Sequence, residues 1–99
     1  MAERTPKPNG DGPISNIVTI CNERGLHARA ASKFVKLVAK FEADVEVTKG
    51  GQSVSGTSIL GLMMLAAGPG TEIVISTSGP QAQEAASALC GLVEARFEE

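Results

Sequence analysis

The residues best suited to chemistry are His27 and Arg29, which lie between a Gly-Leu turn and a helical pattern. His27 is the only histidine in the chain. From Ala31 onward, apolar residues recur at intervals of three and four, which predicts an amphipathic helix that begins at or just after His27. The backbone N–H groups of its first turn, from Ala28, Arg29 and Ala30, would lack intrahelical acceptors. Together with the positive end of the helix dipole, they predict a small anion site.

Phosphoryl transfer is the chemistry that this pair suits best. The guanidinium of Arg29 is a permanent cation whose fork of N–H groups matches phosphate oxygens. A nucleophilic imidazole beside an anion site can carry a phosphoryl group, and such a transfer needs positioning and charge stabilisation more than covalent work by the protein. The alternative is that His27 is an ordinary surface histidine near a helix start, and the residue alone does not decide between the two.

Composition limits the chain to one domain and excludes several partners. Its 99 residues, 42% of them apolar, suffice for one modest core, and no long uninterrupted apolar run occurs. The net charge of −2 and the absence of Trp and Tyr argue against a nucleic-acid partner. Cys21 and Cys90 are isolated, which predicts two reduced structural thiols and no metal site. Without an apolar signal segment at the N-terminus, we expect a cytoplasmic protein with no membrane partner and no cofactor.

Charge is distributed unevenly along the chain. Between residues 24 and 41 there are five cations and no acid, namely Arg24, Arg29, Lys33, Lys36 and Lys40. From residue 81 onward the charged side chains are mostly acidic, namely Glu84, Glu94, Glu98 and Glu99 beside one cation, Arg96. The first helix is thus expected to be basic and the last helix acidic. A run of like charge is usually a solvated face, but beside the predicted anion site it equally suits a docking surface for acidic partners, to which Lys33 and Lys36 would contribute.

Hydrophobic patterning predicts a folded domain that follows a short tail. Residues 1–14 contain three prolines and mixed charges, which predicts a disordered tail, and residues 15–99 form the domain. Alternation predicts strands at residues 16–21, 43–48, 52–55 and 71–77. Helical spacing predicts one helix that ends at about residue 40, one from 59 to about 66, and a last helix with Pro80 at its first position.

The predicted order β-α-β-β-α-β-α defines the fold class. Each of the four strands has one apolar face, and each helix has an apolar face that must be buried against another element. This combination implies an α+β protein. We therefore expect a two-layer open-faced sandwich, in which three helices cover one face of a four-stranded antiparallel sheet. In the second helix, Ser58 suits the N-cap, and Leu62 and Leu65 are the candidate core residues.

Two segments carry a family signature. Residues 25–35 resemble the phosphorylation site of HPr, the histidine-containing phosphocarrier of the bacterial phosphotransferase system; they read GLHARAASKFV. Residues 57–65 and 70–73 resemble the regulatory serine region of the same family; they read TSILGLMML and GTEI. The resemblance covers about residues 15–95 in unbroken order and extends to NPr, the relative that serves nitrogen-related regulation.

The resemblance implies a phosphocarrier and not an enzyme that turns over a substrate of its own. His27 would accept a phosphoryl group on Nδ1 from the phosphohistidine of enzyme I, which phosphoenolpyruvate charges, and pass it to a histidine on an enzyme IIA. Arg29 and the first-turn amides of Ala28, Arg29 and Ala30 would hold the phosphoryl oxygens. The output would be sugar uptake or nitrogen-related regulation. A carrier that docks on two partners in turn is most simply a monomer.

The resemblance also implies regulation and docking through the second helix. Ser58 matches the serine that HPr kinase/phosphorylase modifies in many bacteria, in addition to its role as N-cap. A phosphate there would place about two negative charges beside the docking surface. Ile59, Leu60 and Met63 share a face at helical spacing and are expected to form an exposed patch that docks on enzyme I and enzyme IIA.

One position departs from the family pattern, and two other functions are alternatives to the carrier. The family usually has proline after the arginine, where this chain has Ala30, which retains an N–H that proline lacks. The first alternative function is a regulatory adaptor that acts only through Ser58 phosphorylation, against which the presence of His27 with Arg29 argues. The second is a small hydrolase or isomerase with His27 as base, for which the sequence places no second acid, base or nucleophile nearby.

Overall fold

The structure is a computed structural model that describes residues 13–99, so the tail predicted at residues 1–14 lies largely outside the described residues. The strands are β1 (Ile14–Thr19), β2 (Asp44–Lys49), β3 (Gln52–Ser55) and β4 (Glu72–Ser78). The helices are α1 (Ala28–Val38), α2 (Ile59–Met64) and α3 (Ala82–Glu94), followed by a single 3-10 turn, η1 (Arg96–Glu98).

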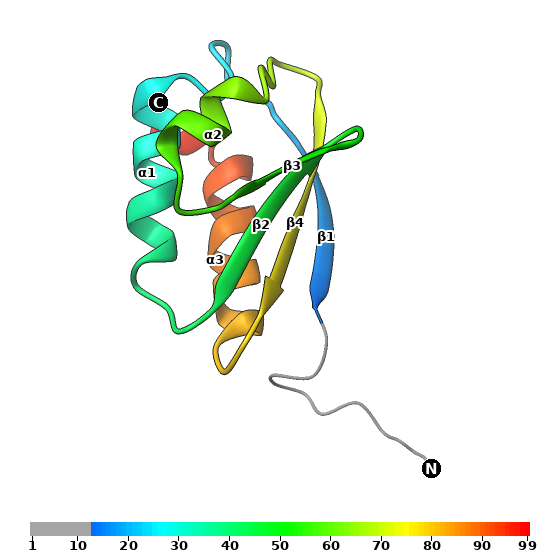
Figure 1. Ribbon diagram of the computed structural model, residues 1–99. Coiled ribbons are helices and arrows are strands. Elements are labelled where there is room, and N and C mark those ends of the chain that lie inside the picture. The colour runs from blue at the N-terminus through cyan, green and yellow to red at the C-terminus, as the bar shows by residue number, and fades with distance from the viewer. Residues whose placement is uncertain (1–12) are drawn as a thin grey trace.

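The four strands form one antiparallel sheet in the order β1-β4-β2-β3. All three helices cover the same face of this sheet, and the opposite face is left open (Figure 1). The predicted α+β open-faced sandwich is therefore confirmed. Within the described part of the chain, no helix is long and apolar enough to cross a membrane.

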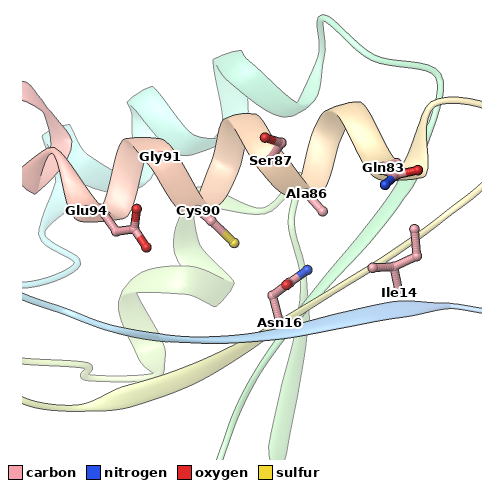
Figure 2. A pocket seen from close by; sticks show the side chains of 8 residues that line it. All are labelled: Ile14, Asn16, Gln83, Ala86, Ser87, Cys90, Gly91 and Glu94. Carbon is pink, nitrogen blue, oxygen red and sulfur yellow. The ribbon is translucent and has the colours of Figure 1, made fainter.

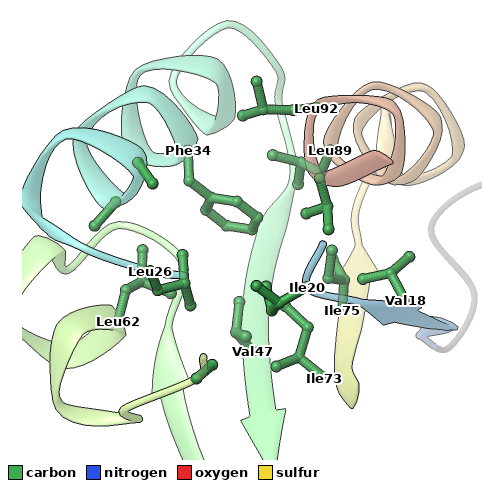
Figure 3. Packing of buried hydrophobic residues seen from close by; sticks show 14 of the residues in the cluster. Val18, Ile20, Leu26, Phe34, Val47, Leu62, Ile73, Ile75, Leu89 and Leu92 are labelled. Carbon is green, nitrogen blue, oxygen red and sulfur yellow. The ribbon is translucent and has the colours of Figure 1, made fainter. Parts of the chain in front are cut away.

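The core lies between the helices and the covered face of the sheet. Alternate residues of the strands, together with Ile20 just after β1, point to this side and are buried, namely Val18, Ile20, Val45, Val47, Ile73 and Ile75. Phe34 points from α1 into the space between α1, α3 and the sheet (Figure 3). Leu62 and Leu65 of the second helical segment are also buried, as predicted. Because Phe34 is fully enclosed, the core determines how α1 lies on the sheet and therefore where its N-terminus points.

The first strand differs from its prediction by two residues at each end. β1 begins at Ile14, a residue of the predicted tail, and Ile14 pairs with Thr77 of β4. The strand ends at Thr19, whereas the pattern predicted an end at Cys21. Alternation of apolar residues continues through the buried Ile20, which explains why the pattern alone extended the strand too far.

The predicted start of the last helix at Pro80 is wrong, since α3 begins at Ala82. Gln81 N–H donates a hydrogen bond to the carbonyl oxygen of Glu42 at 2.9 Å, and Gln81 Oε1 accepts one from Glu42 N–H at 2.8 Å. Gly79, with φ of 106°, turns the chain towards this contact. The pairing with the loop before β2 therefore holds residues 79–81 in a turn, and the helix starts after it.

The C-terminal turn η1 was not predicted from periodicity. Its residues Arg96, Phe97 and Glu98 have φ of 58°, 53° and 62°, and none is glycine. The left-handed conformation costs about 1–2 kcal/mol per residue, which the complete burial of Phe97 offsets in part by about 1.5–3 kcal/mol. The turn lies beside the N-terminal half of α1 (Figure 1). Because α3 ends at Glu94, the prediction that Glu98 and Glu99 belong to an acidic helix is wrong for these two residues.

Candidate functional site

His27 is the N-cap of α1, which confirms the predicted start of this helix. Its backbone is extended, with φ of −77° and ψ of 179°, and its Nδ1 accepts a hydrogen bond from Arg29 N–H at 3.2 Å. The first intrahelical bond runs from Ala31 N–H to the carbonyl oxygen of His27 at 2.9 Å. The amides of Ala28 and Ala30 precede that bond, so helix geometry gives them no acceptor. The Arg29 amide, expected to be open to an anion, is instead directed at the imidazole.

The turn before His27 is fixed by contacts with the segment after α2. Gly25 has φ of 65°, and a Cβ at this position would collide with the carbonyl oxygen of Ala67, so only glycine fits. Leu26 is buried, and its N–H donates to that same oxygen at 3.0 Å. Asn22 Nδ2 donates to the carbonyl oxygen of Gly25 at 2.9 Å. Packing on both sides of the turn therefore determines the position of the imidazole.

The second ring nitrogen of His27 faces a carboxylate from the far end of the chain. Nε2 hydrogen-bonds to Oε2 of Glu99, and the two side chains are 16% and 26% exposed. The other carboxylate oxygen accepts a hydrogen bond from Asn22 Nδ2 at 3.3 Å. The hydrogen bond from His27 is the main cause that lowers the pKa of Glu99 below its ordinary value of 4.5, with Asn22 and the charge of Arg24 as further causes. Glu99 is therefore a carboxylate at neutral pH.

The same C-terminal segment occupies part of the basic face of α1. Lys33 Nζ donates a hydrogen bond to the carbonyl oxygen of Phe97 at 2.8 Å and lies 3.9 Å from Oε1 of Glu98. Arg29 and Lys36 are exposed. The basic run is thus divided, because Lys33 holds η1 whereas Arg29 and Lys36 face solvent.

The second helix begins with a local cap and leaves apolar side chains exposed. Ser58 is its N-cap, as predicted, and Ser58 Oγ accepts a hydrogen bond from Gly61 N–H at 2.9 Å. The exposed apolar side chains, which we call the α2 patch, are Ile59 (40%), Leu60 (68%), Met63 (39%) and Met64 (64%). Exposure is confirmed for the three predicted residues. Met64 was missed, although its spacing of four from Leu60 indicates the same face. Since α2 contacts α1, the patch and His27 lie on neighbouring elements (Figure 1).

Comparison with known proteins decides the family. The family model described as "PTS HPr component phosphorylation site" matches residues 14–95. The chain belongs to the HPr family.

Relatives and solved structures agree with this membership of the HPr family. Phosphocarrier protein NPr of Shewanella violacea is 45% identical over 82 residues, which cover 83% of this chain and 90% of that protein. Phosphocarrier protein HPr of Cupriavidus necator is 46% identical over 81 residues, which cover 82% and 91%. The crystal structure of HPr-C-His from Thermoanaerobacter tengcongensis matches with a TM-score of 0.83 at 36% identity, covering 87% of this chain and 97% of that one.

Membership of the HPr family establishes the general role. The protein is a histidine phosphocarrier of the phosphotransferase system, of the HPr/NPr type, and not a catalytic enzyme. The family implies enzyme I and an enzyme IIA as its partners. His27 lies at the end of a packed helix and is half-buried.

A groove of about 540 Å³ lies between β1 and α3 (Figure 2). Its lining includes Asn16, Cys90 and Glu94, and none of its lining residues belongs to the predicted phosphorylation site or docking surface of this HPr-family protein. Burial, followed by the negative charge of Glu94, raises the pKa of the Cys90 thiol, so Cys90 is protonated at neutral pH. Cys90 and Cys21 are both free. Among residues 13–99 there is no group of three or more His, Cys, Asp or Glu side chains that could hold a metal ion.

The structure therefore brings His27 and Arg29 together at one helix end, as the pattern predicted, and adds two residues that the pattern did not indicate. These are Asn22, which is buried, and Glu99, which is 72 positions away from His27. The acidic composition of the C-terminal residues was the only available signal, and it did not specify a partner for any of them.

Proposed function

We propose that His27 is the residue that carries the phosphoryl group in this HPr-family protein, accepting it from enzyme I and passing it to an enzyme IIA. The observation that supports this most directly is the position of Nδ1 at the N-cap of α1, where it accepts a hydrogen bond from Arg29 N–H. A ring nitrogen that accepts a hydrogen bond has a lone pair, which attack on phosphorus requires.

The transfer is a displacement at phosphorus. The lone pair of His27 Nδ1 forms a new N–P bond while the N–P bond to the donor histidine of enzyme I breaks, and the donor nitrogen keeps the electron pair. In the second transfer a ring nitrogen of the enzyme IIA histidine attacks, and Nδ1 leaves with its pair. Both steps depend on alignment and on stabilisation of the charged oxygens, which are the contributions a rigid carrier can make.

The phosphoryl oxygens would meet the N-terminal amides of α1 and the Arg29 guanidinium. The amides of Ala28 and Ala30 have no helical acceptor, and the Arg29 amide already lies beside Nδ1. Ala30 keeps an N–H donor that proline would lack. No acidic residue lies in the first turn of α1, so its own side chains do not neutralise the positive end of the helix dipole.

The α2 patch and Lys36 are proposed as the surface that docks on both partners. Contiguous exposed apolar side chains mark interaction sites, and flexible methionine side chains can fit more than one partner. Lys33 would contribute while it keeps its hydrogen bond to the Phe97 carbonyl oxygen. Because one surface binds two partners in turn, the carrier is proposed to act as a monomer.

Ser58 is proposed as a regulatory phosphorylation site for HPr kinase/phosphorylase. It lies next to Ile59 and Leu60 of the α2 patch, and its side chain is half-buried against the first turn of α2. A phosphate at this N-cap would stay favourable for the helix while it places about two negative charges beside the docking surface. The expected consequence is weaker docking without unfolding of α2.

The output of the carrier is proposed to be sugar uptake or nitrogen-related regulation. The identity to the NPr of Shewanella violacea, 45%, and that to the HPr of Cupriavidus necator, 46%, are too similar to separate the two branches. Transfer from the phosphorylated carrier to a purified sugar-specific enzyme IIA and to a nitrogen-related enzyme IIA, compared side by side, assigns the branch.

Labelling from phosphoenolpyruvate through purified enzyme I tests the acceptor. We expect one phosphoryl group per chain, lost in acid and stable in alkali, as phosphohistidine is. The variant His27→Ala should give no label and should keep the circular dichroism spectrum of the wild type, because the side chain is partly exposed at a helix end.

A label that persists in His27→Ala would contradict the proposal. An acid-stable label that needs ATP and a kinase, and that disappears in Ser58→Ala, would identify the regulatory site. If that were the sole label obtained with cognate enzyme I present, the protein would act as an adaptor through Ser58 alone.

A further inference from the structure

Two contacts occupy both nitrogens of the His27 ring. Nδ1 accepts a hydrogen bond from Arg29 N–H at 3.2 Å, so it is unprotonated. Nε2 faces the carboxylate of Glu99, which can only accept, so Nε2 carries the proton. A single neutral tautomer satisfies both contacts, with the proton on Nε2 and the lone pair on Nδ1.

We propose that Glu99 is a positioning residue for phosphoryl transfer. Its carboxylate holds His27 in the tautomer that keeps the proton on Nε2 and the lone pair on Nδ1, and it faces the positive charge that the ring gains when Nδ1 bonds to phosphorus. The inference rests on the proposed function, because it takes His27 as the acceptor. A carboxylate bonded to one imidazole nitrogen generally fixes the tautomer and stabilises the imidazolium that forms at the other.

The position of Glu99 is determined by several contacts besides its own with His27. Phe97 is fully buried, and its carbonyl oxygen accepts a hydrogen bond from Lys33 Nζ at 2.8 Å. Asn22, itself 1% exposed, donates both to the Glu99 carboxylate at 3.3 Å and to the carbonyl oxygen of Gly25 at 2.9 Å. The same amide group therefore ties the carboxylate to the turn that carries the imidazole.

The backbone of η1 supports the same conclusion. Three consecutive non-glycine residues, 96–98, are left-handed there, and such conformations persist only where the surrounding structure over-determines them. The position of Glu99 is therefore determined by the tertiary packing of this turn and not by the local backbone preferences of residues 96–98.

Charge also favours the carboxylate at this place. No acidic residue lies in the first turn of α1, where acids usually stabilise a helix, and Glu99 brings one there from 72 positions away. The carboxylate faces Nε2, on the other side of the ring from the nitrogen that attacks. It can therefore balance the charge of the ring while the Arg29 N–H, and not the carboxylate, lies beside Nδ1.

The test compares Glu99→Ala with Glu98→Ala in the full chain. Both variants remove one negative charge from the same segment, but Glu98 lies near Lys33 and does not contact His27. Nitrogen-15 NMR of the His27 ring, at a pH where the imidazole is neutral, reports which nitrogen carries the proton. We expect the wild type and Glu98→Ala to show a protonated Nε2 and an unprotonated Nδ1, whereas Glu99→Ala shows signals averaged between the two tautomers.

The rate of label acceptance from enzyme I gives the second readout. We expect it to fall about two- to tenfold in Glu99→Ala, the loss typical of one hydrogen bond near the surface. Glu99→Gln keeps a neutral acceptor for Nε2–H and should recover part of both the rate and the tautomer signal. Glu98→Ala should keep the wild-type rate.

The inference would be overturned if Glu99→Ala changed neither readout or only one of them. An equal loss in Glu98→Ala would also overturn it, by assigning the effect to net charge. A wild-type chain that takes no acid-labile phosphate would refute the proposed function, and with it the role in transfer. If that wild-type chain still showed a His27 tautomer that changes in Glu99→Ala, the contact between Glu99 and His27 would stand and only the proposed function would fail.

Discussion

The N-termini of α1 and α2 satisfy the same hydrogen-bonding requirement in different ways. At α2, Ser58 Oγ accepts a hydrogen bond from the N–H of Gly61, three residues further on, at 2.9 Å. At α1 the cap is His27, whose Nδ1 accepts from Arg29 N–H while Nε2 reaches Glu99 at the opposite end of the domain sequence. The first cap is complete within one turn, whereas the second depends on the packing of the whole chain.

The α2 cap therefore serves to stabilise its helix, whereas the α1 cap also presents a reactive ring nitrogen. Serine is among the preferred N-cap residues and histidine is not, so the α1 cap stabilises its helix less but presents a nitrogen with a lone pair. The α1 end is covered by the C-terminal segment, which holds the ring. The α2 end instead directs Leu60 and its neighbours to solvent, where partners can reach them.

Removal of the Phe97 side chain, which anchors the C-terminal segment beside α1, should have the largest effect. Phe97→Ala deletes a fully buried aromatic side chain and is expected to lower the free energy of unfolding by about 3–5 kcal/mol, as measured by urea denaturation. It should also abolish the Glu99-dependent tautomer of His27. The matched control is Phe41→Ala, since Phe41 is only half-buried and should cost less. Equal losses in both variants would mean that η1 is not anchored by Phe97.

Next in size is the effect of a charge on the open end of α2. Leu60→Glu should slow phosphoryl transfer from enzyme I at least about tenfold, because a buried carboxylate would disrupt an apolar interface. The free energy of unfolding of Leu60→Glu should differ from that of the wild type by no more than about 1 kcal/mol, since Leu60 is 68% exposed. Ile17→Glu is the control, because Ile17 is 67% exposed but lies on β1, outside the α2 patch. A similar loss of transfer in both variants would remove the patch from docking.

The local cap at α2 should have a moderate effect on stability. Ser58→Ala removes the acceptor of the Gly61 N–H and is expected to cost about 1 kcal/mol in urea denaturation. Thr57→Ala, which alters an exposed neighbour, is the control and should cost less. The NMR signals of His27 should be unchanged in both variants, and a shift in Ser58→Ala would show that the two helix ends are coupled.

The smallest effect concerns the pH dependence of the contact between His27 and Glu99. Because the pKa of Glu99 is lowered in the folded protein, its contribution to stability is complete above the unfolded value of about 4.5 and is lost as the pH falls through the lowered folded value. Melting temperatures of wild type and Glu99→Gln, measured from about pH 5 to about pH 3, should therefore converge as the pH falls.

The convergence should be modest, because solvent screens this surface pair. Asn22 and Arg24 also act on the Glu99 carboxylate and stay in place in both proteins, and Glu98→Gln controls for the loss of one charge. A difference that grows as the pH falls would have the wrong sign for a lowered pKa and would contradict the assigned contact.

Local pattern was enough to recognise both helix ends. The three- and four-residue spacing from Ala31 places a helix start at His27, and Ser58 before an apolar run predicts the second cap. Both features depend on residues within one turn, so periodicity and capping preference detect them. The exposure of Leu60 and Met63 was also predictable, because a helix that is apolar almost all round cannot bury every face against one sheet.

Boundaries and long-range contacts were not predictable in this way. Pro80 was assigned to a helix start because its fixed φ suits that position, yet the hydrogen bonds between Gln81 and Glu42 hold a turn there. Likewise, no local preference favours a left-handed turn at Phe97 without glycine. That turn is stable because a core built from distant elements encloses the phenyl ring.

The amino-acid pattern alone was thus sufficient for the order of elements, the open-faced sandwich and the histidine at the start of the first helix, because each follows from neighbours a few positions apart. Packing alone brought Glu99 to that histidine. Residues 72 positions apart come into contact only when the sheet, α1 and α3 have packed together. No repeating pattern along the chain predicts such a contact.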